Sequence, residues 1–191
     1  MLGKQAKILS DDNIRDLLAY TTHTRNLDRN RVIVLLSVKA GLRAGEISNL
    51  TWDMVTGSTG EIGTVIALED RIAKKKSGRV IPIHRDLRDA LVILWNATDG
   101  IGPIIKSERG GPMAPLSIVI WFTIAYRAIG VIGCSSHSGR RTFVTRAARI
   151  VHKAGGSLRD VQLLAGHRSI QTTQRYIDGD SDAQRRLVAL L

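Results

Sequence analysis

The chain has 191 residues, of which 43% are hydrophobic, and its 28 Lys and Arg against 17 Asp and Glu give a formal net charge of +11. This length and hydrophobic content exclude a disordered chain and predict a folded domain with a sizeable core, and no apolar run approaches the ~20 residues of a transmembrane helix. The basic excess favours a polyanionic partner, either nucleic acid or an anionic membrane surface, over a soluble protein that is basic without consequence.

Helical signals dominate the first fifty residues. Ser10 precedes two acidic residues and an apolar pattern, which is typical of a capped helix start. The apolar stretch 30–41 predicts a buried helix that ends at Gly41, because glycine readily adopts the left-handed backbone that follows a helix. The sequence AGEISNL predicts a further short helix directly after it.

Short strands are predicted next along the chain. The β-branched runs GTVIAL and GRVIPI lie on either side of AKKKSG, whose Ser-Gly pair suits a turn. This region therefore predicts two or three small strands. Residues 85–97 and 115–129 are mostly apolar on one face and predict helices.

The clearest amphipathic helix is predicted over residues 138–153, with one apolar and one basic face. The apolar face consists of Phe143, Ala147, Ile150 and Val151, and the basic face consists of Arg146, Arg149 and Lys153.

Three shorter helices complete the expected fold. A Ser cap at Ser157 and a stop at Gly166 bound the first, and the others are expected around 169–177 and 181–190. The chain is thus predicted to be a single mainly α domain with a small antiparallel β-sheet on one edge, an α+β fold.

Two distant segments carry the positive charge. Residues 71–88 hold seven basic side chains and one acid, and residues 137–176 hold eight basic side chains and one acid. The rest of the chain is close to balance, so a fold that joins these segments produces one basic face.

Several kinds of chemistry lack their usual residues. The five His residues show no zinc-type spacing, the acids do not cluster as a two-metal nuclease needs, and neither a phosphate-binding Walker loop nor a GxSxG elbow occurs. No metal and no cofactor are therefore expected. The lone Cys134 cannot form an internal disulfide, which favours a reducing, cytoplasmic setting.

A set of cationic and neutral donors accompanies one tyrosine instead. Arg43 follows a helix-ending glycine, His137 and Arg140 lie three apart at a helix start, and His167 precedes Tyr176 by nine residues. Each residue alone has an ordinary structural explanation, such as a helix cap or half-buried packing. Together with a nearby lysine they are suited to hold a phosphodiester without metal, because the arginine fork donates two hydrogen bonds to phosphate oxygens.

Three stretches, GLRAGEISNLTW, HSGRRTFVT and LAGHRSIQTTQRY, resemble the boxes of the tyrosine recombinases, the phage integrase family. The resemblance covers nearly the whole chain and implies the catalytic-domain fold of DNA breaking and rejoining enzymes. The residues that it carries over are Arg43 and Glu46 from the first box, His137 and Arg140 from the second, and His167 and Tyr176 from the third.

The resemblance implies a set of side chains that bind the scissile phosphate. Arg43 and Arg140 clamp the non-bridging oxygens and stabilise the pentavalent transition state, His167 hydrogen-bonds the same phosphate, and Glu46 positions the first arginine.

The resemblance also implies the proton transfers. Tyr176 attacks phosphorus and forms a 3′-phosphotyrosyl link, and His137 assists removal of its proton. A hairpin lysine protonates the leaving 5′ oxygen. Counting back eight residues from the proline of VIPI gives Lys74, with Lys75 and Lys76 as adjacent alternatives.

DNA is the expected partner, bound as a duplex and without any membrane. The basic side chains expected to contact it are Lys75, Lys76, Arg79, Arg141, Arg168 and Arg175. The implied assembly is a homotetramer on DNA, accompanied by accessory DNA-bending proteins, in the cytoplasm at the nucleoid.

The chain departs from full-length family members at its N-terminal end. Only the segment before Ser10 precedes the catalytic domain, so residues 1–191 are expected to form a single catalytic domain without the N-terminal core-binding domain, either as a fragment or as a catalytic-domain-only member. Residues 180–191 end in an apolar helix that either docks on a neighbouring protomer or folds back on its own domain.

Two rival functions remain open. A type IB topoisomerase-like enzyme would use the same chemistry without joining two sites, but His137 favours a recombinase. A non-catalytic DNA-binding relative would use only the basic face, and the filled catalytic positions argue against it. The sequence does not separate integration, excision, inversion and dimer resolution, which share one chemistry.

Overall fold

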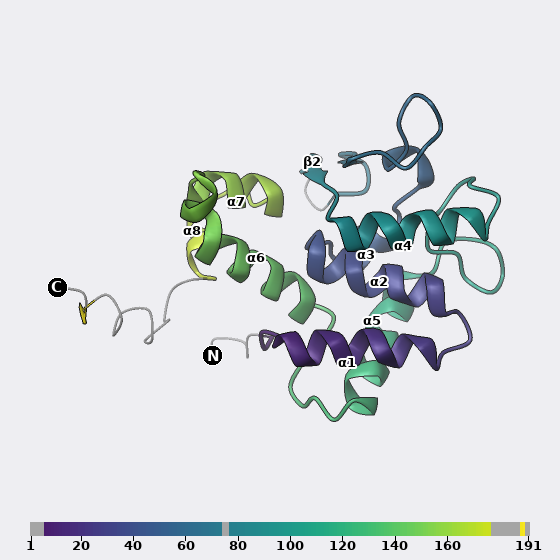
Figure 1. The fold of residues 1–191 in the computed structure, drawn as a ribbon, viewed down its shortest axis with the longest axis horizontal. Helices are drawn as coiled ribbons and strands as arrows, with labels where there is room; N and C mark the ends of the chain where they lie inside the picture. Colours follow the sequence, from purple (N-terminus) through teal and green to yellow (C-terminus); the bar gives the residue numbers. More distant parts are fainter. Residues whose placement is uncertain (1–5, 74–76, 177–187, 190–191) are drawn as a thin grey trace.

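The computed structural model describes residues 6–73, 77–176 and 188–189 (Figure 1). In chain order the elements are α1 (Asp11–Thr22), α2 (Leu27–Lys39), α3 (Ala44–Ser48), the 3-10 helix η1 (Trp52–Met54), β1 (Val65–Leu68), β2 (Arg79–Pro82), α4 (Arg85–Asn96), α5 (Pro115–Ala128), α6 (Ser138–Ile150), the 3-10 helix η2 (Val151–Ala154), α7 (Leu158–Ala165) and α8 (Ile170–Gln174). A mostly helical chain with a small antiparallel sheet confirms the predicted fold class. The helix expected around 181–190 lies almost wholly outside the described residues, and within them no helix is both long enough and apolar enough to span a bilayer.

Local sequence signals account for the ends of the first helices. The Ser10 hydroxyl accepts the Asn13 amide at 3.0 Å, and the Asn13 side chain accepts the Ser10 amide at 3.2 Å, which closes a capping box on α1. After α2, Gly41 adopts a φ of +65°, and a Cβ there would lie 2.4 Å from the Phe143 ring. Glycine is thus required both for the left-handed turn and for the approach of α6.

Helix α2 is the central helix of the larger core. It packs against α1, α4 and α6 and is buried along most of its length. Figure 1 shows α2 lying between α1 and α4, with α6 leading away toward α7 and α8.

A smaller second core lies under the last helices. It consists of Val144, Ala148, Val151, Val161 and Ala165, and the side chain of Tyr176 packs against it. This cluster buries small aliphatic groups only, so it contributes less than the main core to the free energy of unfolding.

The described part of the middle region contains two paired strands. Strands β1 and β2 are antiparallel, with Ile66 opposite Ile81 and both side chains buried. A Cβ on Gly78 would lie 2.8 Å from the Leu68 carbonyl oxygen, so the return into β2 requires glycine. Because β2 packs against α7, the two basic segments of the sequence meet.

The predicted apolar face of α6 is wrong in part. Ile150 is 57% exposed, whereas Val144 and Ala148 are buried and follow the buried Arg140 at intervals of four. Arg140 donates hydrogen bonds inside the protein, which rotates the helix so that its fourth and eighth successors face inward. The α-helix ends at Ile150, and the 3-10 turn η2 returns Val151 to the interior.

Candidate active site

One cavity of about 380 Å³ gathers residues from all three boxes. Its walls are formed by Ala6, Arg43, His137, Arg140, Arg141, His167, Thr172, Arg175 and Tyr176. The predicted catalytic residues of the first, second and third boxes therefore share one space, although they come from widely separated parts of the chain. Lys74, Lys75 and Lys76 lie outside the described residues.

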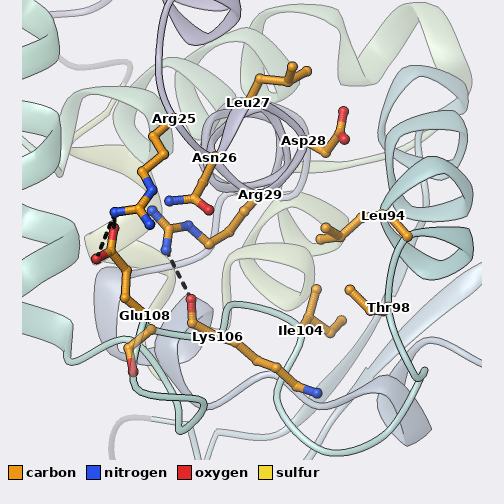
Figure 2. A pocket seen from close by; sticks show the side chains of 12 residues that line it. Arg25, Asn26, Leu27, Asp28, Arg29, Leu94, Thr98, Ile104, Lys106 and Glu108 are labelled. Atoms are coloured by element: carbon orange, nitrogen blue, oxygen red, sulfur yellow. Dashed lines mark hydrogen bonds and ion pairs between the residues drawn. The ribbon is translucent and has the colours of Figure 1, made fainter.

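A cavity at the other end of α2 has different chemistry (Figure 2). It measures about 350 Å³ and includes the N-terminal turn of α2 and residues near the end of α4. Here Arg25 pairs with the Glu108 carboxylate at 3.3 Å, and Arg29 donates to the Lys106 carbonyl at 3.0 Å. Asp28 and Glu108 line this cavity and repel an anion, whereas no acidic residue of the described chain lines the first cavity, so this cavity is the weaker candidate for a phosphate site.

Arg43 is held by a carboxylate three residues later. Arg43 caps α3, where its amide donates to Glu46 Oε2 at 2.9 Å and its guanidinium donates to Oε1 at 2.8 Å. Glu46 is only 2% exposed. Burial alone raises the pKa of this carboxyl, but hydrogen bonds and charge from Arg79 and Arg43 outweigh burial and lower the pKa below its usual value. Glu46 is therefore ionised and orients Arg43 beside the cavity.

Arg140 connects three segments of the chain. Its guanidinium is buried and donates to the Gly41 carbonyl at 2.6 Å and to the Ala165 carbonyl at 2.6 Å. Burial, followed by the charge of Arg43, lowers its pKa to about 10, so it stays protonated at neutral pH. The turn after α2, the start of α6 and the end of α7 thus meet at one cation.

The hydrogen bonds of His167 identify its tautomer. Nε2 lies 3.1 Å from the Arg140 guanidinium, which can only donate, so Nε2 accepts. The ring proton is therefore on Nδ1, which donates to Thr173 Oγ1 at 3.0 Å. Burial, followed by the charges of Arg140 and Arg43, lowers the pKa of His167 to about 4, so the ring is neutral at pH 7.

This lowered pKa predicts a pH dependence of stability. In the unfolded chain His167 takes up a proton near pH ~6.5, whereas in the folded protein it stays neutral down to about 4. Between these values the unfolded state binds more protons, so the free energy of unfolding falls as the pH falls from about 6.5 to about 4. Urea unfolding across this range should show a steeper fall for the wild-type protein than for His167→Gln. Equal slopes would contradict the burial of a neutral ring.

Tyr176 lies just beyond the end of α8, although the helix was predicted to extend over 169–177. Helix α8 ends at Gln174, and Tyr176 occupies the following turn, where its amide donates to the Thr173 carbonyl at 3.0 Å. Its ring stacks on the His167 ring at 5.4 Å between centroids, and the Arg141 guanidinium lies 5.9 Å from its centre. The tyrosine is therefore half-buried by packing and also lines the cavity.

Thr173 is a site residue that the sequence analysis missed. It is fully buried, its hydroxyl accepts from His167, and its carbonyl accepts from Tyr176. No motif signal distinguishes it from Thr172, because only the turn of α8 decides which threonine faces inward.

Replacing Thr173 with Val is expected to leave the His167 Nδ1–H without an acceptor. The free energy of unfolding should fall by about 1–3 kcal/mol, the usual cost of an unsatisfied buried donor. Urea unfolding measures this change. The matched control is Thr123→Val on the exposed side of α5, whose hydroxyl bonds only to its own helix at 3.0 Å, and it should change stability by less than about 0.5 kcal/mol.

The remaining predicted residues divide into three groups. His137 is exposed at the N-cap of α6 and lines the cavity, as do Arg141 and Arg175. Arg168 is exposed beside the cavity, in a neighbouring hollow of about 350 Å³. Arg79 differs from the expectation of a DNA contact, because its side chain is 6% exposed and its donors reach Glu46 and the Leu164 carbonyl.

Comparisons with known proteins agree with this geometry. The model of the phage integrase family matches residues 7–182. Tyrosine recombinase XerA of Thermococcus kodakarensis is 30% identical over 173 residues, which cover 89% of this chain and 57% of that protein. The chain thus spans about half the length of the curated relatives that it matches.

Two solved structures share the fold. The crystal structure of XerA recombinase has a TM-score of 0.75 at 22% identity and covers 100% of this chain and 65% of that one. A lambda integrase tetramer bound to a Holliday junction has a TM-score of 0.70 at 19% identity and covers 90% of this chain and 48% of that one.

Proposed function

Because the chain belongs to the phage integrase family, we propose that it carries out site-specific DNA recombination, cutting and rejoining strands through Tyr176 without metal or cofactor. The observation that carries this proposal is the shared cavity, in which Arg43, Arg140, His137 and His167 surround the tyrosine of the same chain. Guanidinium groups are well suited to a phosphodiester, and among the described residues no cluster of three or more His, Cys, Asp or Glu side chains is arranged to hold a metal ion.

In the proposed reaction, Arg43 and Arg140 bind the non-bridging oxygens of the scissile phosphate. Arg140 remains charged, since its lowered pKa is still about 10, and Glu46 restricts the rotation of Arg43. The guanidinium groups are already in position to stabilise the negative charge that develops around the pentavalent phosphorus. The protein therefore needs little reorganisation to reach the transition state. The free energy of the transition state falls accordingly.

His167 requires a proton before it can donate to the phosphate through Nε2. In the unliganded site its only ring proton is used by Thr173, and Nε2 accepts from Arg140. A phosphate drawn into the cavity supplies negative charge beside the ring and raises its pKa, so proton uptake accompanies binding of the substrate.

The strand transfer itself exchanges one phosphoester bond for another. The Tyr176 oxygen forms a bond to phosphorus as its proton passes to His137, and the bond to the 5′ oxygen breaks as Lys74 protonates that oxygen. The product is a 3′-phosphotyrosyl link and a free 5′ hydroxyl. Attack by a 5′ hydroxyl from another strand reverses the step, so the energy of the bond is kept without ATP.

We propose double-stranded DNA as the partner and a homotetramer as the active assembly. The tetramer of lambda integrase on a Holliday junction supports this arrangement by analogy of fold. Residues 1–191 act in it as one catalytic domain, residues 180–191 dock on a neighbouring protomer, and DNA-bending proteins assist at the nucleoid. Arg141, Arg168 and Arg175 contact DNA around the cavity, since all three lie beside it.

The test uses a supercoiled plasmid that carries the DNA flanking this gene, incubated with the protein in EDTA and quenched with SDS. We expect protein covalently attached to 3′ ends, and sequencing of the products should show two sites joined. Relaxation of the plasmid without joined sites would favour a topoisomerase-like enzyme. DNA binding without any adduct would overturn the proposed catalysis and favour a DNA-binding relative.

A further inference from the structure

Arg79 donates hydrogen bonds both to the Glu46 carboxylate in α3 and to a backbone carbonyl in α7. It is the first residue of β2, and its side chain is almost completely buried between α3 and α7. Nη1 and Nη2 donate to the two oxygens of Glu46 at 3.1 and 3.2 Å, and Nε donates to the Leu164 carbonyl at 2.8 Å. Every nitrogen of this guanidinium is therefore engaged within the protein.

The Glu46 carboxylate lies between two guanidinium groups. Arg43 approaches Oε1 from the side of the cavity at 2.8 Å, and Arg79 approaches from the side of β2. A buried carboxylate needs compensating charge. Without Arg79 that charge must come from Arg43 alone, which draws Arg43 toward Glu46 and weakens the field that it offers to a phosphate.

The contact of Arg79 with the end of α7 affects the part of the site that contains His167. The last carbonyls of a helix lack partners within the helix, and cations satisfy them. Arg79 satisfies Leu164, and Arg140 satisfies the adjacent Ala165. At Gly166 a Cβ would lie 2.9 Å from Arg79 Nη1, so the arginine packs directly on the turn that precedes His167.

We infer that Arg79 is a positioning residue that sets Arg43 through Glu46 and sets His167 through the end of α7. This inference rests on the proposed function and refines it. It connects the start of β2 to Arg43 and to His167, which both bind the scissile phosphate in the proposed reaction. It also replaces the expected contact of Arg79 with DNA.

The test measures cleavage and DNA affinity separately. Arg79→Met is expected to lower the single-turnover rate of adduct formation on the plasmid by about 100-fold while the dissociation constant for DNA changes by less than about threefold. Arg79→Lys should fall between Arg79→Met and the wild-type protein. Arg29→Met is the matched control, since it removes a half-buried arginine bonded to a carbonyl at the far end of α2, and it should cleave at the wild-type rate (Figure 2).

A second variant tests the charge argument. Glu46→Gln should slow cleavage in the wild-type protein but should cost little further in Arg79→Met, because the carboxylate no longer competes for Arg43. Additive losses would overturn the link through Glu46. If Arg79→Met lost affinity for DNA but formed the adduct at the wild-type rate, Arg79 would be a DNA-contacting residue and the inference would be wrong.

A ligand-free measurement separates this inference from the proposed function. Nitrogen-15 NMR of the His167 ring should show its signals shifted in Arg79→Met and unchanged in Arg29→Met. Unchanged signals in both variants would overturn the positioning of His167. A wild-type protein that forms no adduct would refute the proposed function, and the ring signals would still decide the role of Arg79.

Discussion

Replacing Tyr176 with Phe is expected to abolish the covalent link between protein and DNA, lowering the rate of adduct formation by about four orders of magnitude or more. In the proposed reaction the phenol oxygen bonds to phosphorus, and phenylalanine lacks this oxygen. The Phe ring retains the stacking on His167 and the contact with Arg141, so the fold and the affinity for DNA should be preserved. Denaturing gels of SDS-quenched plasmid reactions measure the adduct.

The control for this experiment is a second tyrosine. Tyr126 in α5 is buried, stacks on Phe122 at 5.8 Å, and its hydroxyl has no hydrogen-bond partner in the part of the chain that the structure describes. Burial raises the pKa of Tyr126, which makes it a poor nucleophile. Tyr126→Phe should therefore form the adduct at the wild-type rate. Retention of the adduct in Tyr176→Phe would assign the nucleophile elsewhere.

Replacing Arg140 with Lys should have the next largest effect. One ammonium group cannot serve the Gly41 carbonyl, the Ala165 carbonyl and a phosphate in the geometry of the planar guanidinium. We expect the cleavage rate to fall by about 100-fold or more, the usual cost of losing one preorganised donor to transition-state charge. The free energy of unfolding should also fall by about 1–3 kcal/mol, because a buried acceptor is left without its donor.

Arg146→Lys provides the comparison on the same helix. Arg146 pairs with Asp11 at 2.7 Å on the surface and lies outside the cavity, so its replacement should leave cleavage unchanged. A near-wild-type rate in Arg140→Lys would show that charge alone, without the guanidinium fork, is sufficient at this position.

Much of this fold could be predicted because its signals are local. Ser10 and Gly41 mark helix boundaries through their own backbone preferences, and Gly166 ends α7 with a φ of +63° as expected. The resemblance of three stretches to the phage integrase family pointed to the box residues, and the structure brings Arg43, Arg140 and Tyr176 to one cavity.

The predictions from sequence failed where contacts between distant parts of the chain determine which side chains are buried. The apolar pattern of α6 favoured an inward Ile150, but the hydrogen bonds of Arg140 to two distant carbonyls determine which face is buried. Arg79 resembled a surface cation in a basic segment, and only the fold reveals Glu46 beside it. The role of Thr173 depends on a tautomer, which no sequence pattern encodes.

The attachment of α7 and α8 to the rest of the molecule has a consequence for DNA binding. Helix α7 packs against α6, β2 and η2, Leu164 packs on the larger core, and two arginines donate to consecutive carbonyls of α7. In the proposed reaction the phosphate binds the same Arg140 guanidinium that donates to the Ala165 carbonyl at the end of α7. Binding of the proposed substrate therefore adds a contact to the segment that carries Tyr176, so amide hydrogen exchange in α7 and α8 should slow on binding, while exchange in α2 stays constant.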